Sequence, residues 1–241
     1  MILQLEGVFS GYRPEHDVLR NLTLAVPRGG VVSIIGPNGA GKSTIFKTIF
    51  GFLRAKAGRI LFDGRDITNR SPREVLLRGI GYVPQGALVF GNMTVQENLE
   101  MGGYVLAGKA AQTAVRQVYE VFPILGNLRR RLAKTLSGGE RQLLAMARGV
   151  LTRPKLMCLD EPSLGLAPRL VQQTFEYIKD IRRMGVTVLI IEQNARSALV
   201  ASDYAYVLDI GTVRFEGSGV EILANPDVRR LYLGETMPAA R

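Results

Sequence analysis

A glycine-rich string at residues 36–44 constrains the fold of this chain more than any other feature. It reads Gly-Pro-Asn-Gly-Ala-Gly-Lys-Ser-Thr and matches the pattern G-x-x-x-x-G-K-[ST]. The apolar run Val31–Ile35 precedes it and predicts a buried strand, and a helix is expected to begin at about Lys42. A strand, a glycine loop and a helix in this order predict a phosphate-binding loop within an α/β fold.

The residue types in this string suit a chain of phosphates. Glycines let the backbone turn its N–H groups inward without side-chain clashes, and the start of a helix adds unpaired donors. Lys42 would reach the β- and γ-phosphates as a point charge, and Ser43 would ligate Mg²⁺. The residues expected to contact a nucleotide here are Gly36, Pro37, Asn38, Gly39, Ala40, Gly41, Lys42, Ser43 and Thr44.

The order of predicted elements indicates a parallel α/β core interrupted by helices. Strand-like alternation occurs near residues 3–5 and 22–26, and residues 59–62 lead into the hairpin signal Asp63-Gly64. Capping patterns begin at Ser71 and Thr94, and residues 94–150 are mostly helical in pattern. Strands are predicted again at 156–159, 186–191 and 204–208, with a helix at 168–184. We therefore expect one domain over residues 1–241, with a helical lobe at approximately 94–150 and a peripheral tail from Arg230.

Two adjacent carboxylates end the apolar strand predicted at Leu156–Leu159. An acid at the carboxyl end of a parallel strand lies in the ligand crevice of such folds. Asp160 would hold Mg²⁺, through water. Strand side chains alternate, so Glu161 should point to the other side and is the better candidate to polarise an attacking water.

A second helix start carries a serine and two glycines. The string Leu136-Ser137-Gly138-Gly139-Glu140 lies shortly before the acidic pair in the sequence. Its residues predict another helix end able to bind an anion. One chain would then carry two phosphate-binding helix ends, a combination that a P-loop kinase would not need.

Composition and charge narrow the classes of function that remain open. The formal net charge is +10, but the basic residues are scattered except at Arg129–Arg131, and tryptophan is absent. We therefore predict no nucleic-acid partner, while proximity to an anionic membrane surface stays open. No segment reaches the ~20 apolar residues that a membrane helix needs, and no signal peptide is evident at the N-terminus. The single cysteine, Cys158, excludes an internal disulfide and is expected to be an inert core thiol.

These motifs together resemble the nucleotide-binding subunits of ABC transporters, over essentially the whole chain. The resemblance implies a P-loop NTPase core with a parallel sheet, an antiparallel β subdomain and an inserted helical lobe, with ATP and Mg²⁺ as cofactors. Tyr12 falls where the family stacks an aromatic ring on adenine, and Gln85 falls at the glutamine that senses Mg²⁺ and the membrane partner. Two subunits would bind head-to-tail, so that each ATP also meets Ser137, Gly138 and Gly139 of the other subunit.

A subfamily is also indicated. The strings at residues 85–99, 160–168 and 191–196 look like those of importers of branched-chain amino acids, most like the smaller of their two ATPase subunits. Gln193 stands where most relatives carry a histidine, and we expect it to help position the catalytic water without transferring a proton. The only histidine, His16, is expected in a loop. Glu161, Gln193 and Lys42 are thus the predicted catalytic residues, and Ser43, Gln85 and Asp160 the predicted metal-binding residues.

The resemblance implies a set of partners and a location. The chain would work with two transmembrane permease subunits, with a second ATPase subunit that is either a sister chain or another copy, and indirectly with a solute-binding protein. It would lie at the cytoplasmic face of the inner membrane. The alternative is a non-transport ABC ATPase acting on a nucleic-acid or ribosome-associated complex, although such proteins usually carry two cassettes or a long insertion. A P-loop kinase and a purely regulatory nucleotide-binding module are further alternatives. The transported solute is not specified by this sequence.

Overall fold

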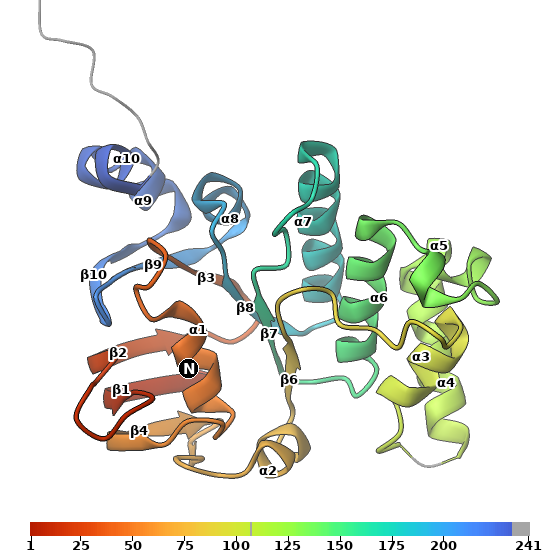
Figure 1. The fold of residues 1–241 in the computed structure, drawn as a ribbon, viewed down its shortest axis with the longest axis horizontal. Helices are drawn as coiled ribbons and strands as arrows, with labels where there is room; N and C mark the ends of the chain where they lie inside the picture. Colours follow the sequence, from red (N-terminus) through yellow and green to blue (C-terminus); the bar gives the residue numbers. More distant parts are fainter. Residues whose placement is uncertain (107, 233–241) are drawn as a thin grey trace, which may run out of the picture. The chain divides into compact units, whose positions relative to one another are not determined.

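The computed structural model describes residues 1–106 and 108–232, and the chain divides into two compact units. The first unit comprises Met1–Val75 and Leu189–Arg241, and the second comprises Leu76–Val188. The boundary passes through strand β8 (Thr187–Ile191) and helix α2 (Pro72–Leu77), which therefore contribute to both units. The elements are labelled in chain order in Figure 1.

An antiparallel sheet in the first unit has the strand order β2-β1-β4-β5. These strands are β1 (Leu3–Ser10), β2 (Leu19–Val26), β4 (Ala55–Phe62) and β5 (Arg65–Asp66). Alternating apolar residues such as Leu3 and Leu5 are fully buried, as the period-2 pattern predicts. Asp63 and Gly64 connect β4 to β5 with φ angles of 52° and 73°, the left-handed pair that a two-residue hairpin turn requires.

The parallel strands of the first unit carry the glycine loop. Within this unit the order is β10-β9-β3 followed by the end of β8, and β3 (Val31–Ile35) pairs in parallel with β9 (Tyr204–Asp209). β3 is completely buried, which explains its uninterrupted apolar run. β10 (Thr212–Gly217) pairs antiparallel with β9. The helices of this unit are α1 (Lys42–Ile49), α8 (Ala195–Ala201), α9 (Gly219–Ala224) and α10 (Pro226–Tyr232).

The second unit is dominated by helices. Its strands β6 (Ile80–Val83) and β7 (Leu156–Asp160) pair in parallel. Helix α6 (Gly138–Val150) packs against α3 (Val95–Gly102), α7 (Pro168–Arg183) and β6, and so forms the centre of the helical region. The remaining helical elements are α4 (Lys109–Val121), α5 (Pro123–Asn127) and the 3₁₀ turn η1 (Ala133–Thr135). All described elements between residues 94 and 150 are helical, as the sequence pattern predicts.

Helix starts follow the capping residues that the sequence identifies. The Thr94 hydroxyl accepts the N–H of Glu97 while the Glu97 carboxylate accepts the N–H of Thr94, a complete capping box. Ser71 and Glu74 make the same exchange at α2. The predicted peripheral tail begins at Arg230 within α10, where Arg230 and Leu231 are exposed. The rest of that prediction lies outside the described residues.

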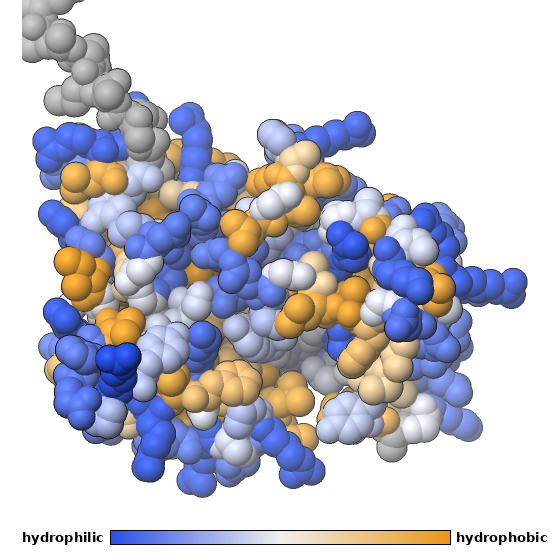
Figure 2. Space-filling view, viewed as in Figure 1, coloured by the Kyte–Doolittle hydropathy of each residue, from blue (hydrophilic) through white to orange (hydrophobic). Residues whose placement is uncertain are grey.

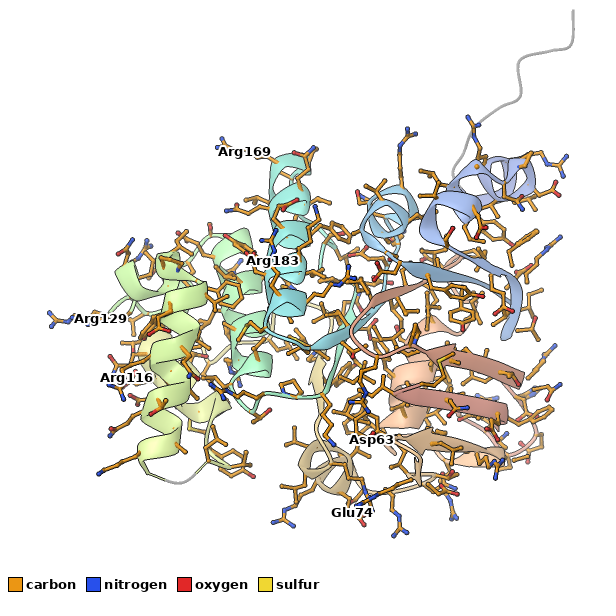
Figure 3. The ribbon with its side chains drawn as sticks, turned by 180° about the vertical axis from the view of Figure 1, so that it is seen from behind. Asp63, Glu74, Arg116, Arg129, Arg169 and Arg183 are labelled. Atoms are coloured by element: carbon orange, nitrogen blue, oxygen red, sulfur yellow. The ribbon has the colours of Figure 1, made fainter. Side chains whose placement is uncertain are left out.

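The surface is mixed in character. In the face drawn in Figure 2, apolar side chains lie between larger hydrophilic areas. Arg116 on α4 and Arg129 in the turn after α5 project outward (Figure 3), and Arg129, Arg130 and Arg131 are all exposed. None of the described helices is both long enough and apolar enough to cross a bilayer.

Candidate functional site

The phosphate loop of the first unit joins β3 to α1 through glycines, two of which stand where a side chain would clash or strain the backbone. A Cβ on Gly36 would lie 2.2 Å from the Leu208 carbonyl oxygen, so the loop can lie against β9 only with glycine there. Gly41, the N-cap of α1, has φ 102°, in the region that side chains disfavour. α1 also has no acidic residue in its first turn to neutralise the positive end of its dipole.

Lys42 lies beneath this loop and not in solvent. Only 5% of the residue is exposed, and its ammonium donates to the carbonyl oxygens of Gly36 at 2.8 Å and Pro37 at 3.0 Å. These contacts hold the positive charge inside the concave backbone of the loop, where an anion would meet it. Ser43 follows at the start of α1 and is half-buried, while Pro37, Asn38 and Gly39 form the exposed rim.

Two further predicted residues also lie in the first unit. Tyr12 is 57% exposed, and its hydroxyl accepts a hydrogen bond at 3.1 Å from Lys47 on α1. Gln193 is exposed in the turn between β8 and α8. The carboxylate of Glu192, which is 1% exposed, accepts the backbone N–H groups of Gln193 at 3.1 Å and Asn194 at 3.2 Å. Sequence reasoning missed Glu192, although a carboxylate directly after an apolar strand was a usable signal.

The second unit brings three of the predicted residues into contact with neighbours that suit their roles. Asp160 is 4% exposed and accepts a hydrogen bond from the Tyr82 hydroxyl at 3.2 Å. Gln85 Nε2 donates to Glu161 Oε2 at 2.9 Å. Gln85 and Glu161, which were predicted separately, are 76 positions apart in the sequence, so only the fold places them together.

The strand-alternation argument for Glu161 was wrong. β7 ends at Asp160, and Glu161 has φ 48°, a left-handed backbone that is not part of an extended strand. A non-glycine residue in this region costs free energy and persists only when its surroundings hold it there. The backbone turn after β7 and the bond from Gln85 therefore set the direction of the Glu161 carboxylate.

The serine–glycine helix start has the geometry that its sequence predicts. Ser137 is the N-cap of α6, and its hydroxyl accepts the Glu140 N–H while Glu140 accepts the Ser137 N–H. A Cβ on Gly139 would lie 2.9 Å from a Leu170 methyl, so glycine permits the close packing of α6 and α7. A cavity of about 490 Å³ beside this helix start is lined by Gly86, Lys134, Gly138, Arg141, Glu161 and Leu166, among others. Its lining therefore includes two cationic side chains, Lys134 and Arg141, and the Glu161 carboxylate.

Cys158 plays no chemical part in this arrangement. It is completely buried in β7, and burial, with a further contribution from the charge of Asp160, raises the pKa of its thiol. The structure thus confirms the part of the prediction that places this thiol in the core.

Comparison with known proteins decides the family. The sequence model of a family described as "ABC transporter" matches residues 19–164. The chain belongs to the ABC transporter family. That match includes the phosphate loop, Gln85, the Ser137–Gly139 helix start and the acidic pair, while Tyr12 and Gln193 lie outside it. The predicted ABC-type ATPase and its fold class are thereby confirmed.

Several relatives match almost the whole of this ABC family member. The high-affinity branched-chain amino acid transport ATP-binding protein BraG of Pseudomonas aeruginosa is 43% identical over 225 residues, which cover 93% of this chain and 97% of BraG. The probable branched-chain amino acid transport ATP-binding protein LivF of Archaeoglobus fulgidus is 36% identical, with coverages of 93% and 95%. A solved ATP-binding cassette of an ABC transporter in its ADP conformation superimposes with a TM-score of 0.87 at 33% identity, covering 97% of this chain and 99% of that one.

Proposed function

We propose that this chain binds and hydrolyses MgATP to power an importer of branched-chain or related amino acids. Support comes from the family match and from two relatives, BraG and LivF, whose names specify branched-chain amino acid transport. The chain would act on the cytoplasmic face of the inner membrane with two permease subunits and a second ATPase subunit, and indirectly with a solute-binding protein. No nucleic acid is part of this proposal.

The residues for nucleotide binding follow from their chemistry. The backbone of Gly36–Thr44 would surround the phosphates, and Lys42 would exchange its two carbonyl contacts for phosphate oxygens. Ser43, Gln85 and Asp160 supply oxygen atoms, the ligand type that Mg²⁺ prefers, and the ion would neutralise charge on the phosphates. Tyr12 would stack on adenine, and its exposed ring suits that role.

The contact between Gln85 and Glu161 is the observation that carries the hydrolytic part of the proposal. A carboxylate fixed by a 2.9 Å hydrogen bond can accept a proton from water and orient it towards the γ-phosphate. Gln193 would donate its amide N–H to a phosphate oxygen or to the water, since its backbone is held by Glu192. Ser137, Gly138 and Gly139 would contact ATP bound to the other ATPase subunit.

An apolar groove in the second unit suits a membrane partner. It encloses about 330 Å³, and its wall includes Tyr82–Pro84, immediately before Gln85. Three of its lining residues are unusually exposed for large apolar side chains: Tyr104 at 73%, Leu88 at 62% and Met101 at 42%. Clustered exposed apolar groups of this kind mark protein contact sites. We infer that a permease segment docks here, next to the segment that holds Gln85.

The proposal is tested by assembling the chain with its candidate permease subunits in lipid vesicles. ATP hydrolysis should require Mg²⁺ and increase when the solute-binding protein is loaded with leucine, isoleucine or valine. Hydrolysis that is stimulated by a different solute would replace the proposed substrate. Failure of any membrane protein to co-purify with a chain that still hydrolyses ATP would favour a non-transport role.

A further inference from the structure

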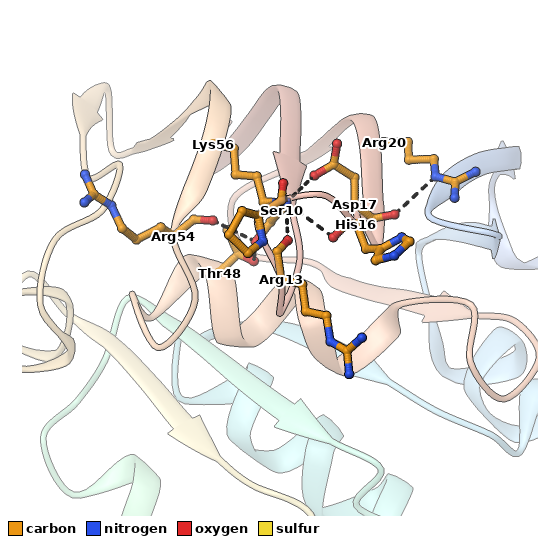
Figure 4. A network of polar contacts seen from close by, with 9 residues as sticks. Ser10, Arg13, His16, Asp17, Arg20, Thr48, Arg54 and Lys56 are labelled. Atoms are coloured by element: carbon orange, nitrogen blue, oxygen red, sulfur yellow. Dashed lines mark hydrogen bonds and ion pairs between the residues drawn. The ribbon is translucent and has the colours of Figure 1, made fainter.

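One lysine holds most of the loop on which Tyr12 lies. Lys56 projects from β4, and its ammonium makes four contacts with this loop (Figure 4). Its Nζ atom donates to the carbonyl oxygens of Arg13 at 2.7 Å, Pro14 at 2.9 Å and His16 at 3.3 Å, and to the Asp17 carboxylate at 2.7 Å.

Other hydrogen bonds to the loop at residues 11–17 join the His16 N–H to the Arg13 carbonyl at 3.3 Å and Arg20 Nε to the Asp17 carbonyl at 3.2 Å. The loop is closed at its base by the bond from the Val18 N–H to the Ser10 carbonyl at 2.8 Å. It folds back so tightly that a Cβ on Gly11 would lie 2.0 Å from the His16 carbonyl oxygen. Residues 12–16 are exposed and belong to no named helix or strand. Segments with this little buried surface open locally at low free-energy cost unless polar contacts hold them.

Tyr12 is held from two sides. Its hydroxyl accepts from Lys47, whose ammonium also lies 5.2 Å from the centre of the tyrosine ring. Lys47 belongs to α1, the helix that follows the phosphate loop, while Lys56 fixes the backbone directly after Tyr12. These contacts hold the ring beside α1, the helix that follows the phosphate loop.

We propose that Lys56 is a positioning residue for the nucleotide base, acting through this loop and Tyr12. The inference rests on the proposed function, in which Tyr12 stacks on adenine. An aromatic ring ordered before binding loses less conformational entropy when the base stacks on it. Without Lys56, the loop carbonyl groups would form hydrogen bonds with water instead. The loop would then have to become ordered when the base binds. Lys56 makes no contact with the phosphate loop in these hydrogen bonds, so its effect is confined to the base.

The experiment compares a ligand that has the base with one that lacks it. Calorimetric titration of the full chain with MgADP and with magnesium pyrophosphate separates base binding from phosphate binding, and neither ligand is consumed. Lys56→Met should weaken MgADP binding by about 3- to 10-fold, the cost of ordering one rotamer-rich side chain on binding, and leave pyrophosphate binding unchanged. Lys56→Arg, which keeps a cation with several donors, should lose less.

Matched variants separate this role from general destabilisation. Arg59 lies on the same strand and pairs with Glu6, so Arg59→Met should bind both ligands as the parent does. Tyr12→Ala should weaken MgADP binding by roughly 5- to 100-fold, the range for loss of one base–aromatic stack, and Lys56→Met should then add nothing further. Amide hydrogen exchange of residues 11–18 should be faster in Lys56→Met than in the parent. It should not accelerate in Lys56→Arg or Arg59→Met.

Three results would overturn the inference. The first is that Lys56→Met binds MgADP as tightly as the parent although the amide hydrogens of its loop exchange faster. The second is an equal loss for pyrophosphate, and the third is an undiminished effect in the Tyr12→Ala background. A Tyr12→Ala variant with parental MgADP affinity would instead remove Tyr12 from the proposed nucleotide site, and the positioning role of Lys56 with it.

Discussion

Glu161 shows how a single residue can be fixed by its backbone. Its left-handed φ of 48° and its bond from Gln85 both constrain the carboxylate, and neither follows from the apolar strand that precedes it. In a functional site such a conformation aims one polar group at one place. The consequence can be tested with a change that preserves the size of the side chain.

Glu161→Gln should abolish most turnover and keep nucleotide binding. An amide has the same shape but cannot accept a proton from water, and general-base catalysis contributes about 10²- to 10⁴-fold to rate. Steady-state hydrolysis and MgATP binding should be measured on the same preparation. Near-parental turnover would exclude Glu161 as the base, whereas loss of binding would indicate that the variant disturbs the turn after β7.

Cys158 should be unreactive towards a thiol reagent while the protein is folded. It is buried, and its raised pKa keeps the thiolate population low at pH 8, so both access and ionisation oppose reaction. Labelling with a disulfide reagent at pH 8 should be slow in buffer and complete in concentrated urea. Rapid labelling without urea would mean that β7 opens readily.

At the scale of elements, sequence reasoning recovered those with strong periodicity. The strands β3, β7, β8 and β9 and the helix α7 were predicted close to their observed bounds. Only parts of β1, β2 and β4 were predicted, and for α1 only its first residue. β6 was missed because Gly81 interrupts its four residues; a Cβ there would lie 3.3 Å from the Gly149 carbonyl oxygen, so glycine favours close packing on α6. β10 was overlooked although Val213 and Phe215 alternate with exposed residues. The helices α8, α9 and α10 have seven residues or fewer, too short for a helical period to stand out.

In the candidate site, too, some features could be predicted from the sequence and others could not. Local motifs identified Lys42, Ser137 and Asp160 as candidates, because each motif lies within a few residues of sequence, and the family resemblance identified Gln85. The contact between Gln85 and Glu161 and the support of Gln193 by Glu192 depend on tertiary placement or on turn geometry. The hold of Lys56 on the loop around Tyr12 likewise joins segments about 40 residues apart.

Two hydrogen bonds between Tyr206 and Ala25 connect the antiparallel sheet of the first unit to its parallel strands. The Tyr206 hydroxyl on β9 donates to the Ala25 carbonyl at 2.8 Å and accepts from the Ala25 N–H at 2.9 Å, on β2. Burial raises the pKa of Tyr206 to about 12 against an ordinary value near 10, although its bond to Ala25 acts in the opposite direction. The ionised hydroxyl could no longer donate, so this link depends on the protonated form.

Tyr206→Phe should lower the free energy of unfolding by about 1–3 kcal/mol near pH 8, because two backbone groups of Ala25 lose their partner. A pKa raised on folding gives stability that is complete below pH 10 and is lost as the pH rises through 12. The difference between parent and variant should therefore shrink between these values. Urea unfolding at pH 8 and pH 11 provides the measurement, and an equal difference at both would disprove the link to ionisation.

At the scale of the whole molecule, the recognised motifs are distributed over both units. The phosphate loop, Tyr12 and Gln193 belong to the first unit, while Gln85, the acidic pair and the Ser137 helix start belong to the second. The proposed head-to-tail pairing adds a further requirement, since the helix start of one subunit would serve nucleotide bound by the other. A chain with one damaged motif could then be complemented by a chain damaged elsewhere.

Mixing Lys42→Ala with Ser137→Arg chains in the assembled transporter should restore part of the ATPase activity. Lys42→Ala removes the charge beneath the phosphates, and the large cation of Ser137→Arg blocks the α6 helix start. In a mixed pair both lesions fall in one composite site, and the other site is intact. If subunits pair at random and sites act independently, roughly a quarter of the parental activity should return.

The control must separate a blocked helix start from a lost helix cap. Ser218 caps α9 through the same exchange with Glu221 that Ser137 makes with Glu140 at α6, so Ser218→Arg removes an equivalent capping box away from any recognised motif. Ser218→Arg alone should hydrolyse ATP close to the parental rate, while Ser137→Arg alone should not. Recovery that fails, although differently tagged copies of both variants are found together in one transporter, would mean that each chain completes its own site. Recovery near a quarter would instead require the phosphates held by one chain to be within reach of Ser137, Gly138 and Gly139 of its neighbour.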